Sequence, residues 1–381
     1  MNKLYIWLVV LIMAISCQDE KSFLKKTKYD DSSKCSILVD TVSIEIDSSA
    51  LPFYSNYSTY EFDNKTFIIG YNRHSHSLQC FDLTNEEYKN NIQMDKDGPN
   101  GISLVLDFYI HNWDSIFIAS RSKLSLINSK AEIVKKWDLR KHEKNGELLV
   151  PFYFNLQYNS PRKSFLYNIE SHQQDNSGKS IMAEFFIDND SLNELPIMFS
   201  DYYAQNKGNF GFLSSINKGY NWGDKIIYNF QFESNIYVYN YQTEQIVIKG
   251  GASKYTKNFA DVMNKNDNDP DVWTKHVVIN PQFFEILSDI TNNLLYRFHF
   301  EDIRYKVANN VYNTIADKKL YLTIFNKNFE IVKEMEMPTN VFSVPSWFLA
   351  NNNLYLFASH PNNKSINLNR MLLYKYQIYY E

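Results

Sequence analysis

The sequence has few cysteines and lacks the short motifs that mark common enzyme and metal-binding families. Its three cysteines, Cys17, Cys35 and Cys80, lie far apart, and no two of them form a CxxC pair. Zinc ribbons and thioredoxin-like redox sites both need such pairs, so neither is supported. The GxSxG of a nucleophile elbow, the GxxxxGK[ST] of a phosphate loop and the GxGxxG of a dinucleotide site are also missing. No specific catalytic constellation or cofactor site follows from the motifs.

A basic block is also missing, and the one N-terminal apolar run is short. The chain has 39 Lys and Arg against 43 Asp and Glu, a formal net charge of −4, and the two signs are interspersed. Such a surface does not attract a polyanion, so we expect no nucleic-acid partner. The apolar run from Leu4 to Ile15 has 12 residues, whereas a membrane-spanning helix needs roughly 20.

This run instead has the form of a secretory signal. Lys3 precedes it, and small Ser16 and then Cys17 follow it directly. The junction resembles a bacterial lipobox, in which the cysteine is acylated and becomes the new N-terminus. Ala14 departs from the bulky aliphatic residue usual three positions before that cysteine. The acidic stretch after it, "QDEK", resembles the signal that sends lipoproteins of Bacteroidota-type bacteria to the outer face of the outer membrane.

We therefore predict a signal peptide over residues 1–16, lipidation at Cys17 and an acylated tether over residues 17–34. The expected location is the outer membrane, lipid-anchored and exposed at the cell surface. The periplasmic face, or a plain signal peptide with a chance cysteine, is the alternative. In an oxidising compartment Cys35 and Cys80 could form one bridge, but we favour two small buried thiols.

One repeated unit organises the rest of the chain. Tyr (28), Phe (27) and Trp (6) are abundant, which suits half-buried pleated sheets. A polar turn, an apolar strand, a polar loop and a second apolar strand recur six times, with further strands before and after. The first apolar strands begin near Phe67, Ile116, Phe165, Ile226, Leu294 and Leu354. Four strands per unit at steps of 49 to 68 residues indicate a β-propeller.

The ends of the chain indicate how the ring closes. The last unit stops at Glu381 after three strands, whereas a spare strand pair, "CSILVDTVSIEID", begins at Cys35. If the segment from Thr41 to Ile46 supplies the missing strand, no large sheet edge is left unpaired. We predict an all-β, six-bladed propeller of four-stranded antiparallel blades over residues 35–381, closed by an N-terminal strand that completes the last blade. Seven blades is the main alternative.

The lipobox, the six units and the link "DKDGPNGI" at Asp95–Ile102 together resemble one protein family. They are similar to the six-bladed β-propeller lipoproteins of Bacteroidota-type bacteria, much of which is known only as a domain of unknown function. Pro99 fixes φ, and Gly98 and Gly101 tolerate positive φ, which suits a tight turn between blades. The resemblance implies the fold and the anchor, and it implies no activity.

One face of the predicted ring is our candidate binding face. Strand direction alternates within a blade, so links between second and third strands emerge on the same side as links between blades. The links between second and third strands carry the polar residues of the candidate face: Arg73, His74, His76, Arg121, Glu170, His172, Gln231, Glu233, His299, Glu301 and His360. The long inter-blade segment Ser253–Val278 should lie on this face too. Ligand sites are often built on loops that a rigid scaffold carries.

We expect a non-catalytic binding or interaction module, with a glycan, a peptide or an envelope protein as partner. A polysaccharide lyase or glycoside hydrolase is the first alternative, and convergence of His172, Glu233, His299 and Glu301 in a deep pocket would favour it. A structural subunit of an envelope complex is the second. His74 and His76 have a spacing that could hold a metal, but a third ligand is missing nearby, and we predict no metal or cofactor.

Overall fold

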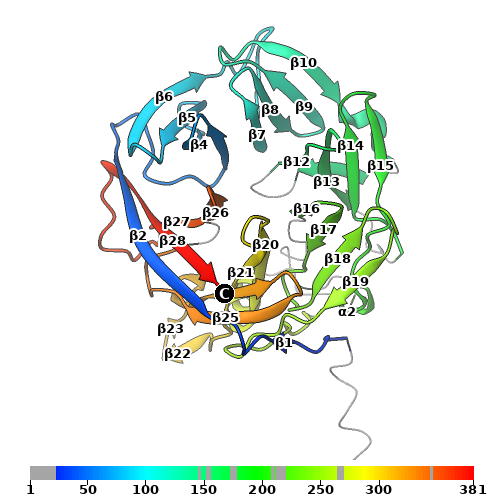
Figure 1. Cartoon of the computed structure of the whole chain (residues 1–381), viewed down its shortest axis with the longest axis vertical. Helices are drawn as coiled ribbons and strands as arrows, with labels where there is room; N and C mark the ends of the chain where they lie inside the picture. Colours follow the sequence, from blue (N-terminus) through cyan, green and yellow to red (C-terminus); the bar gives the residue numbers. More distant parts are fainter. Residues whose placement is uncertain are drawn as a thin grey trace, which may run out of the picture.

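Six β-sheets surround a central axis like the blades of a propeller (Figure 1). The computed structural model describes residues 23–144, 147–151, 156–171, 178–206, 210, 220–263, 270–343 and 346–381. Each blade runs from an inner strand near the axis to an outer strand at the rim, with antiparallel neighbours throughout. The predicted all-β, six-bladed architecture is confirmed.

Five blades are continuous in sequence. Their strands, from inner to outer, are β3 (Tyr57–Phe62), β4 (Lys65–Asn72), β5 (Ser77–Asp82) and β6 (Glu87–Gln93) in blade 1; β7 (Asp107–Asn112), β8 (Ser115–Ser120), β9 (Lys123–Ile127) and β10 (Ile133–Asp138) in blade 2; β11 (Glu147–Pro151) and β12 (Gln157–Asn159), then β13 (Ser164–Ser171), β14 (Met182–Phe186) and β15 (Ser191–Glu194) in blade 3; β16 (Tyr220–Trp222), β17 (Lys225–Tyr228), β18 (Ile236–Asn240) and β19 (Ile246–Lys249) in blade 4; β20 (Gln282–Asp289), β21 (Leu294–Phe300), β24 (Leu320–Asn326) and β25 (Glu330–Glu336) in blade 5. All six apolar strands located in the sequence are the second strands of their blades.

Two blades differ in detail from the sequence pattern. In blade 3 the inner position is shared by β11 and β12, which both pair with β13. In blade 4 the inner strand is β16, which pairs with β17, and the apolar stretch "FLSSIN" at residues 212–217 lies outside the described residues. The strands concerned, β11, β12 and β16, have only three to five residues each, so they give a weak alternation pattern.

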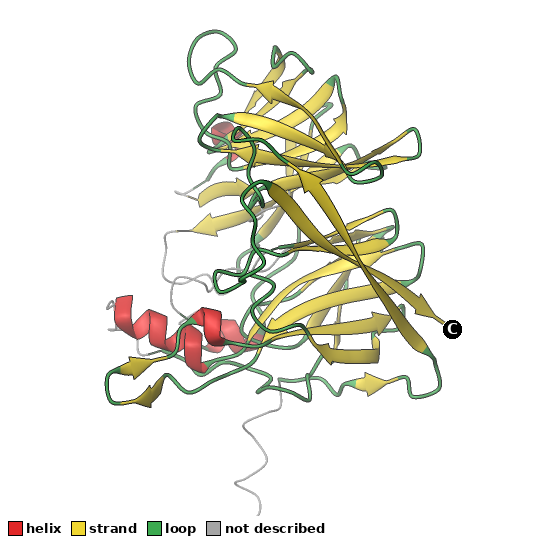
Figure 2. Ribbon diagram, turned by 90° about the vertical axis from the view of Figure 1, so that its left-hand side faces the viewer, coloured by secondary structure: helices red, strands yellow, loops and turns green. Residues whose placement is uncertain are grey.

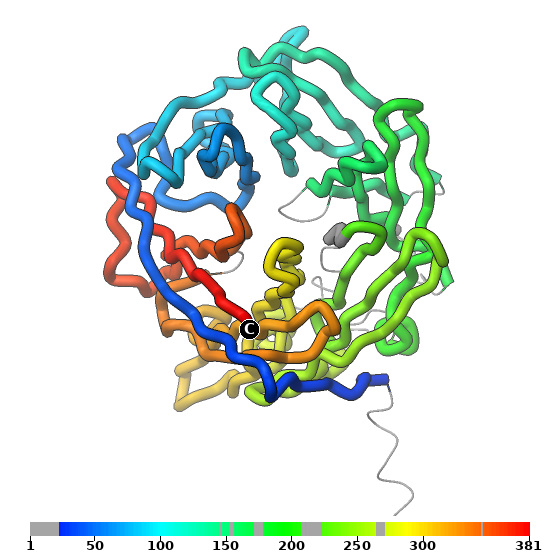
Figure 3. Tube along the Cα trace, in the orientation of Figure 1, coloured from blue at the N-terminus to red at the C-terminus, as the bar shows by residue number. Residues whose placement is uncertain are grey.

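The ring closes as predicted. Blade 6 consists of β26 (Trp347–Ala350), β27 (Asn353–Phe357), β28 (Arg370–Tyr380) and β2 (Cys35–Glu45), the last donated from the N-terminal side. The register runs without a bulge from Cys35 opposite Tyr380 to Glu45 opposite Arg370. Figure 3 shows β2, in blue, lying along β28, in red. The predicted closing strand is therefore correct but longer, because pairing begins at Cys35.

Tight turns join inner to second strands at two places where the sequence offers two consecutive polar residues. Asp63 and Asn64 both have positive φ between β3 and β4, and so do Asn351 and Asn352 between β26 and β27. Two positive φ values define a type I′ turn, whose twist matches that of the flanking strands. Asn and Asp tolerate this conformation better than other non-glycine residues.

The first inter-blade link contains the two glycines singled out in the sequence. Gly98 has a φ of +88°, as predicted. Gly101 is needed for a different reason: a Cβ there would lie 2.6 Å from the carbonyl carbon of Asp97. The turn is closed by hydrogen bonds from the Gly101 N–H to the Gly98 carbonyl (3.0 Å) and from Ile102 to Asp95 (2.8 Å).

The hydrophobic core lies between neighbouring blades. One cluster joins Leu166 and Met182 of blade 3 to Tyr228 and Tyr237 of blade 4. Between blades 5 and 6, the ring of Trp347 stacks on Phe298 with centroids 4.2 Å apart. Burying each large side chain contributes about 1.5–3 kcal/mol, so the blades stabilise one another side by side.

The N-terminal segment, residues 23–34, lies against the outside of blades 4 and 5. Its strand β1 (Lys28–Tyr29) pairs in parallel with β25, and its start crosses the loops of blade 4 (Figure 3). The part of the predicted tether from residue 23 onward thus contacts the propeller. Residues 1–22, including Cys17, lie outside the described residues.

Cys35 and Cys80 are free thiols, Cys35 half-buried and Cys80 buried. Burial raises the pKa of the Cys80 thiol to about 12. Across the described parts of the chain, no helix has the length and apolar character needed to cross a membrane.

Candidate functional site

The two kinds of link that we predicted to share one side do so, and we call that side the loop face. Helix α2 (Asp201–Gln205) and helix α3 (Pro270–Ile279) come from inter-blade links. The hairpin of β22 (Lys306–Ala308) and β23 (Val311–Tyr312) belongs to the link between second and third strands of blade 5. In Figure 2 both helices and this hairpin project from the same side of the ring.

The predicted site residues are spread around the loop face and differ in exposure. Arg73, His74, Arg121 and Glu170 are exposed, Glu301 is half-buried, and His172 lies outside the described residues. His76, Gln231, Glu233, His299 and His360 are buried. Within the described residues, no hydrogen bond or ion pair joins Glu233, His299 and Glu301 to one another, so they do not form one constellation.

Two of the buried histidines hold loops in place. His76 Nδ1 lies 2.7 Å from the Tyr71 hydroxyl. His360 Nδ1 accepts a hydrogen bond from the Asn362 N–H (3.1 Å), so its proton sits on Nε2, which donates to the Ala316 carbonyl at 3.1 Å. In the described ranges, no three His, Cys, Asp or Glu side chains gather closely enough to hold a metal ion.

His299 is sealed inside blade 5. Its ring stacks between Phe283 and Tyr321, with centroids 5.6 and 5.3 Å away. Its Nε2 lies 3.6 Å from Glu334 Oε1, and neither ring nitrogen forms a hydrogen bond with a residue in the described ranges. Burial, and then the charge of Arg297, lowers its pKa well below 6.5, so the ring is neutral.

Arg297, two residues before His299, connects blade 5 to blade 4. This wholly buried guanidinium donates to the Ser234 carbonyl at 2.7 Å and to the Gly251 carbonyl. Both carbonyls belong to blade 4 links on the loop face. Arg297 therefore fixes the loop that carries Glu233.

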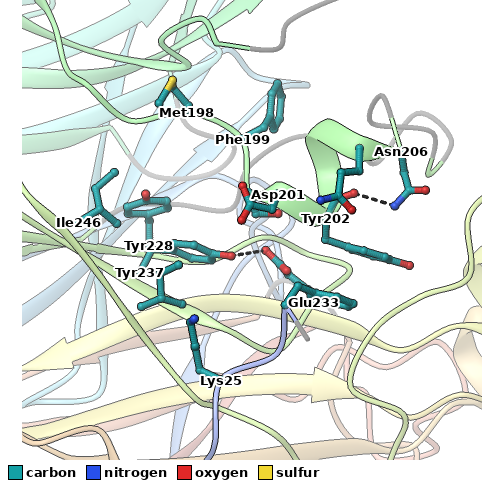
Figure 4. A pocket seen from close by; sticks show the side chains of 14 residues that line it. Lys25, Met198, Phe199, Asp201, Tyr202, Asn206, Tyr228, Glu233, Tyr237 and Ile246 are labelled. Carbon is teal, nitrogen blue, oxygen red and sulfur yellow. Dashed lines mark hydrogen bonds between the residues drawn. The ribbon is translucent and has the colours of Figure 1, made fainter. Parts of the chain in front are cut away.

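Glu233 borders a pocket of about 530 Å³ beside blade 4 (Figure 4). The pocket lies between helix α2, the strands β17 to β19 and the N-terminal segment. Its lining residues are Phe23, Lys25, Met198, Phe199, Ser200, Asp201, Tyr202, Gln205, Asn206, Tyr228, Glu233, Tyr237, Ile246 and Ile248. A volume of this size suits a small-molecule ligand.

The floor of the pocket is polar and buried. The Tyr237 hydroxyl donates to Glu233 Oε1 at 2.7 Å, and the Tyr228 ring stacks on Tyr237 with centroids 5.2 Å apart. Glu233 Oε2 is buried and has no hydrogen-bond partner among the described residues. The carboxyl group thus lies at the floor with one oxygen unsatisfied.

Burial dominates the electrostatics of Glu233. It raises the pKa of this carboxyl to about 7, although the hydroxyls of Tyr237 and Ser200 lower it; the nearby Asp201 carboxylate raises it further. The same burial raises the pKa values of the Tyr237 and Tyr228 hydroxyls. Near neutral pH the floor therefore holds a carboxyl group that is partly protonated and two neutral phenols.

The rim of the pocket carries polar side chains that form no hydrogen bond or ion pair with any other residue that the structure describes. Asp201, Gln205 and Lys25 are exposed, and their side-chain polar atoms have no hydrogen bond or ion pair among the described residues. Ser200 caps the N-terminus of α2 by accepting a bond from the Tyr203 N–H at 3.2 Å. The cap fixes the helix that presents Asp201 and Gln205.

The N-terminal segment forms one wall. The Phe23 ring stacks on Tyr202 with centroids 4.3 Å apart. Lys25 N–H donates to Asn235 Oδ1, and the Asn235 amide donates back to the Phe23 carbonyl, both at 2.9 Å. Because Asn235 lies two residues after Glu233, the same loop holds both the floor carboxyl and this wall.

Sequence reasoning selected Glu233 but missed the residues around it. Tyr228 and Tyr237 read as core strand residues, Asp201 and Gln205 lie in a five-residue helix with no periodic pattern, and Lys25 was assigned to the tether. The one available signal was the aromatic richness of blade 4. Contacts between segments about 200 residues apart leave no local pattern.

Comparison with known proteins agrees with this architecture. A family model described as "Domain of unknown function (DUF4221)" matches residues 32–336. The crystal structure of a DUF4221 member from Bacteroides vulgatus has a TM-score of 0.76 at 19% identity, over 91% of this chain and 99% of that one. A Bacteroides fragilis protein predicted to be exported has a TM-score of 0.57 at 12% identity, over 93% of this chain and 98% of that one.

A search of curated proteins gave no match. At these identities the two solved structures show a common fold and nothing about ligands. The family model spans most of the propeller, from just before the closing strand β2 to the end of blade 5. The chain therefore belongs to the DUF4221 family of β-propellers, as the resemblance in its sequence implied.

Proposed function

We propose that this protein is an exported binding module whose ligand site is the pocket lined by Glu233, Asp201 and Lys25. The proposal narrows the predicted loop-face site to the part beside blade 4. It rests chiefly on one observation: among the described residues, three polar side chains with no hydrogen bond or ion pair surround a hollow whose floor holds a buried carboxyl oxygen that accepts no hydrogen bond. A buried polar atom without a partner is costly for stability alone, and a ligand-facing role accounts for it.

A binding screen on the chain lacking residues 1–17 tests the site. Glycans and short peptides are screened by ligand-observed NMR, and hits are measured by calorimetry. Asp201→Ala and Tyr237→Phe should weaken binding of a hit at least tenfold. Arg121→Ala and His74→Ala, which change exposed loop-face residues outside the pocket, should leave it unchanged. The opposite ranking would move the site elsewhere on the loop face, and binding of envelope proteins alone would favour the structural-subunit alternative.

We further propose that the protein is a lipoprotein of the outer membrane, held through Cys17. The apolar run, the lipobox-like junction and the acidic stretch support this, as does a fold relative that is predicted to be exported. Labelling of cells with a palmitate analogue should mark the wild-type protein and not Cys17→Ala. Protease treatment of intact cells should remove a surface-exposed protein, whereas resistance of a labelled protein would place it on the periplasmic side.

A hydrolase is the second candidate, and one observation favours it. The Asp201 carboxylate is close enough to raise the pKa of Glu233, and glycoside hydrolysis uses a pair of carboxyl groups, one of which acts as an acid with a raised pKa. Prolonged incubation of any bound glycan with the protein, followed by chromatography, distinguishes the two. If the wild type releases reducing ends and Glu233→Gln does not, the protein is a hydrolase. If the glycan stays unchanged, the protein only binds it.

A further inference from the structure

The pocket's balance of charges indicates which ligands it takes, a point that rests on the proposed function. At the rim, the negative charge of Asp201 is matched by the positive charge of Lys25. On the floor, Glu233 is in large part protonated near neutral pH because burial raises its pKa to about 7. The phenols of Tyr228 and Tyr237 are neutral. The part of the pocket lining that the structure describes therefore carries little net charge.

The hydrogen-bonding groups suit hydroxyl groups. Asp201 offers acceptors, Lys25 offers donors, and the amide of Gln205 offers both. The Asn206 side-chain nitrogen donates a hydrogen bond to the Tyr202 carbonyl at 2.8 Å, so the Asn206 side-chain oxygen remains as an acceptor for a ligand. Each hydroxyl of a ligand can both donate and accept, so it can pair with any of these groups.

The walls suit a ring with one apolar face. Phe23 and Phe199 are half-buried and border the pocket, and Ile246 and Ile248 form the side from β19. Phe23 uses one ring face against Tyr202 and its edge against Phe259. A pyranose ring presents C–H groups on one face and hydroxyls around its edge, and it matches walls of this kind.

From these features we infer that the pocket binds an uncharged, polyhydroxylated ligand of saccharide class, and that it binds the protein form in which the Glu233 carboxyl is protonated. A ligand filling the pocket removes the remaining water above Glu233. An ionised carboxylate would then be left buried with no cation beside it, which is unfavourable. The protonated form avoids this cost and gains an O–H donor.

The other titratable groups around Glu233 do not reverse this argument. Tyr228 of β17, Tyr237 of β18 and Tyr202 of α2 have raised pKa values and stay neutral up to pH 9, as does Tyr203. The Asp201 side chain of α2 disfavours a negative charge on Glu233. Among the described residues that line the pocket, Lys25 of the N-terminal segment is the one cation, and it makes no ion pair with Glu233.

The experiment compares matched ligands at two pH values. Probes are neutral mono- and disaccharides of several stereochemistries, including glucose, galactose and N-acetylglucosamine, together with glucosamine and glucuronate as charged analogues. Calorimetry at pH 6 and pH 8 should show a neutral saccharide binding more tightly than its charged analogues. Its affinity should fall about tenfold from pH 6 to pH 8, the loss expected when a group with a pKa near 7 must be protonated.

Glu233→Gln resembles the protonated carboxyl, so it should keep the affinity seen at pH 6 and lose the pH dependence. Glu301→Gln, which changes a carboxyl elsewhere on the loop face, is the matched control and should keep the pH dependence of the wild type. If Glu233→Gln does not fold, the affinity of the native protein across pH 5–9 decides alone. Tighter binding of a charged analogue would overturn the ligand class, and affinity for a neutral saccharide that stays constant or rises with pH would overturn the protonated form of Glu233. Either result leaves the pocket as a site. If none of these saccharides binds saturably to the folded protein, the ligand class is overturned. The proposed function fails as well only if the glycan and peptide screen also gives no ligand for the pocket.

Discussion

Glu233 and His299 occupy comparable places in neighbouring blades and serve different purposes. Both are wholly buried, and both have a nitrogen or oxygen atom without a hydrogen bond among the described residues. His299 is enclosed by the rings of Phe283 and Tyr321, whereas Glu233 borders an open pocket. A buried, unsatisfied titratable group is therefore not sufficient to mark a site, and adjacent space is what separates the two.

The two groups also respond to pH in opposite directions. The folded-state pKa of Glu233 is raised above 4.5, so the folded protein holds its proton longer than the unfolded chain and loses stability as pH rises towards 7. The folded-state pKa of His299 is lowered, so the unfolded chain takes up the proton first and stability falls as pH drops below 6.5. Arg297 joins the two places through the Ser234 carbonyl.

The largest expected effect comes from cutting that connection. Arg297→Met leaves the carbonyls of Ser234 and Gly251 buried without donors, and we expect it to lower the free energy of unfolding by about 3–5 kcal/mol. Urea denaturation followed by tryptophan fluorescence measures it. Arg370→Met, at an exposed pair with Glu45, is the control and should change little. A small effect of Arg297→Met would mean that the two blades are held by packing alone.

The second-largest expected effect is a loss of folding stability as pH rises and Glu233 ionises. Ionising Glu233 at a pKa of about 7 instead of 4.5 costs about 3 kcal/mol by linkage. Glu233→Gln should therefore gain about that much relative to the wild type between pH 4 and pH 8. Paired urea titrations at both pH values give the difference. A constant offset between the two proteins would show that Glu233 is not protonated in the fold.

At acid pH we expect a smaller difference in stability, between the wild type and a variant of His299. His299→Phe fills the same space between Phe283 and Tyr321 with an apolar ring, and we expect it to be at least as stable as the wild type at pH 7. Below pH 6.5 it should gain about 1.4 kcal/mol for each pH unit relative to the wild type. Thermal melts at pH 7.0, 6.0 and 5.0 measure this, and parallel curves would contradict a neutral, sealed His299.

The smallest expected effect concerns the pocket wall. A Cβ at Gly250 would lie 2.4 Å from the Lys26 carbonyl oxygen, so Gly250→Ala should displace the N-terminal segment while leaving the floor intact. We expect faster amide exchange at Lys25, with a change in global stability of about 1 kcal/mol or less. Thr243→Ala, at an exposed turn of the same blade, is the control. Unchanged exchange at Lys25 would show that the segment accommodates the methyl group.

The sequence allowed the fold to be predicted far better than the site. Six recurring strand pairs and a spare N-terminal strand define the ring, because period-two alternation and turn residues are local properties. Of the predicted face, Glu233 borders the pocket, whereas His76, His299 and His360 are packed inside the fold. The pocket forms beside blade 4 because helix α2 and the residues Phe23 and Lys25 meet there. These segments are far apart in the sequence and come together only when the blades have formed.

The eleven-residue pairing of β2 with β28 also determines how the ring resists force. A pull on the N-terminal end of β2 acts at Cys35, while β28 is held by the rest of its blade at Arg370, the opposite end of the ladder. The two strands are then loaded in shear, and the cross-strand bonds, which lie perpendicular to the strands, share the tension at once. A force applied at the N-terminus would therefore have to break many of these bonds together, which takes more force than breaking them one after another.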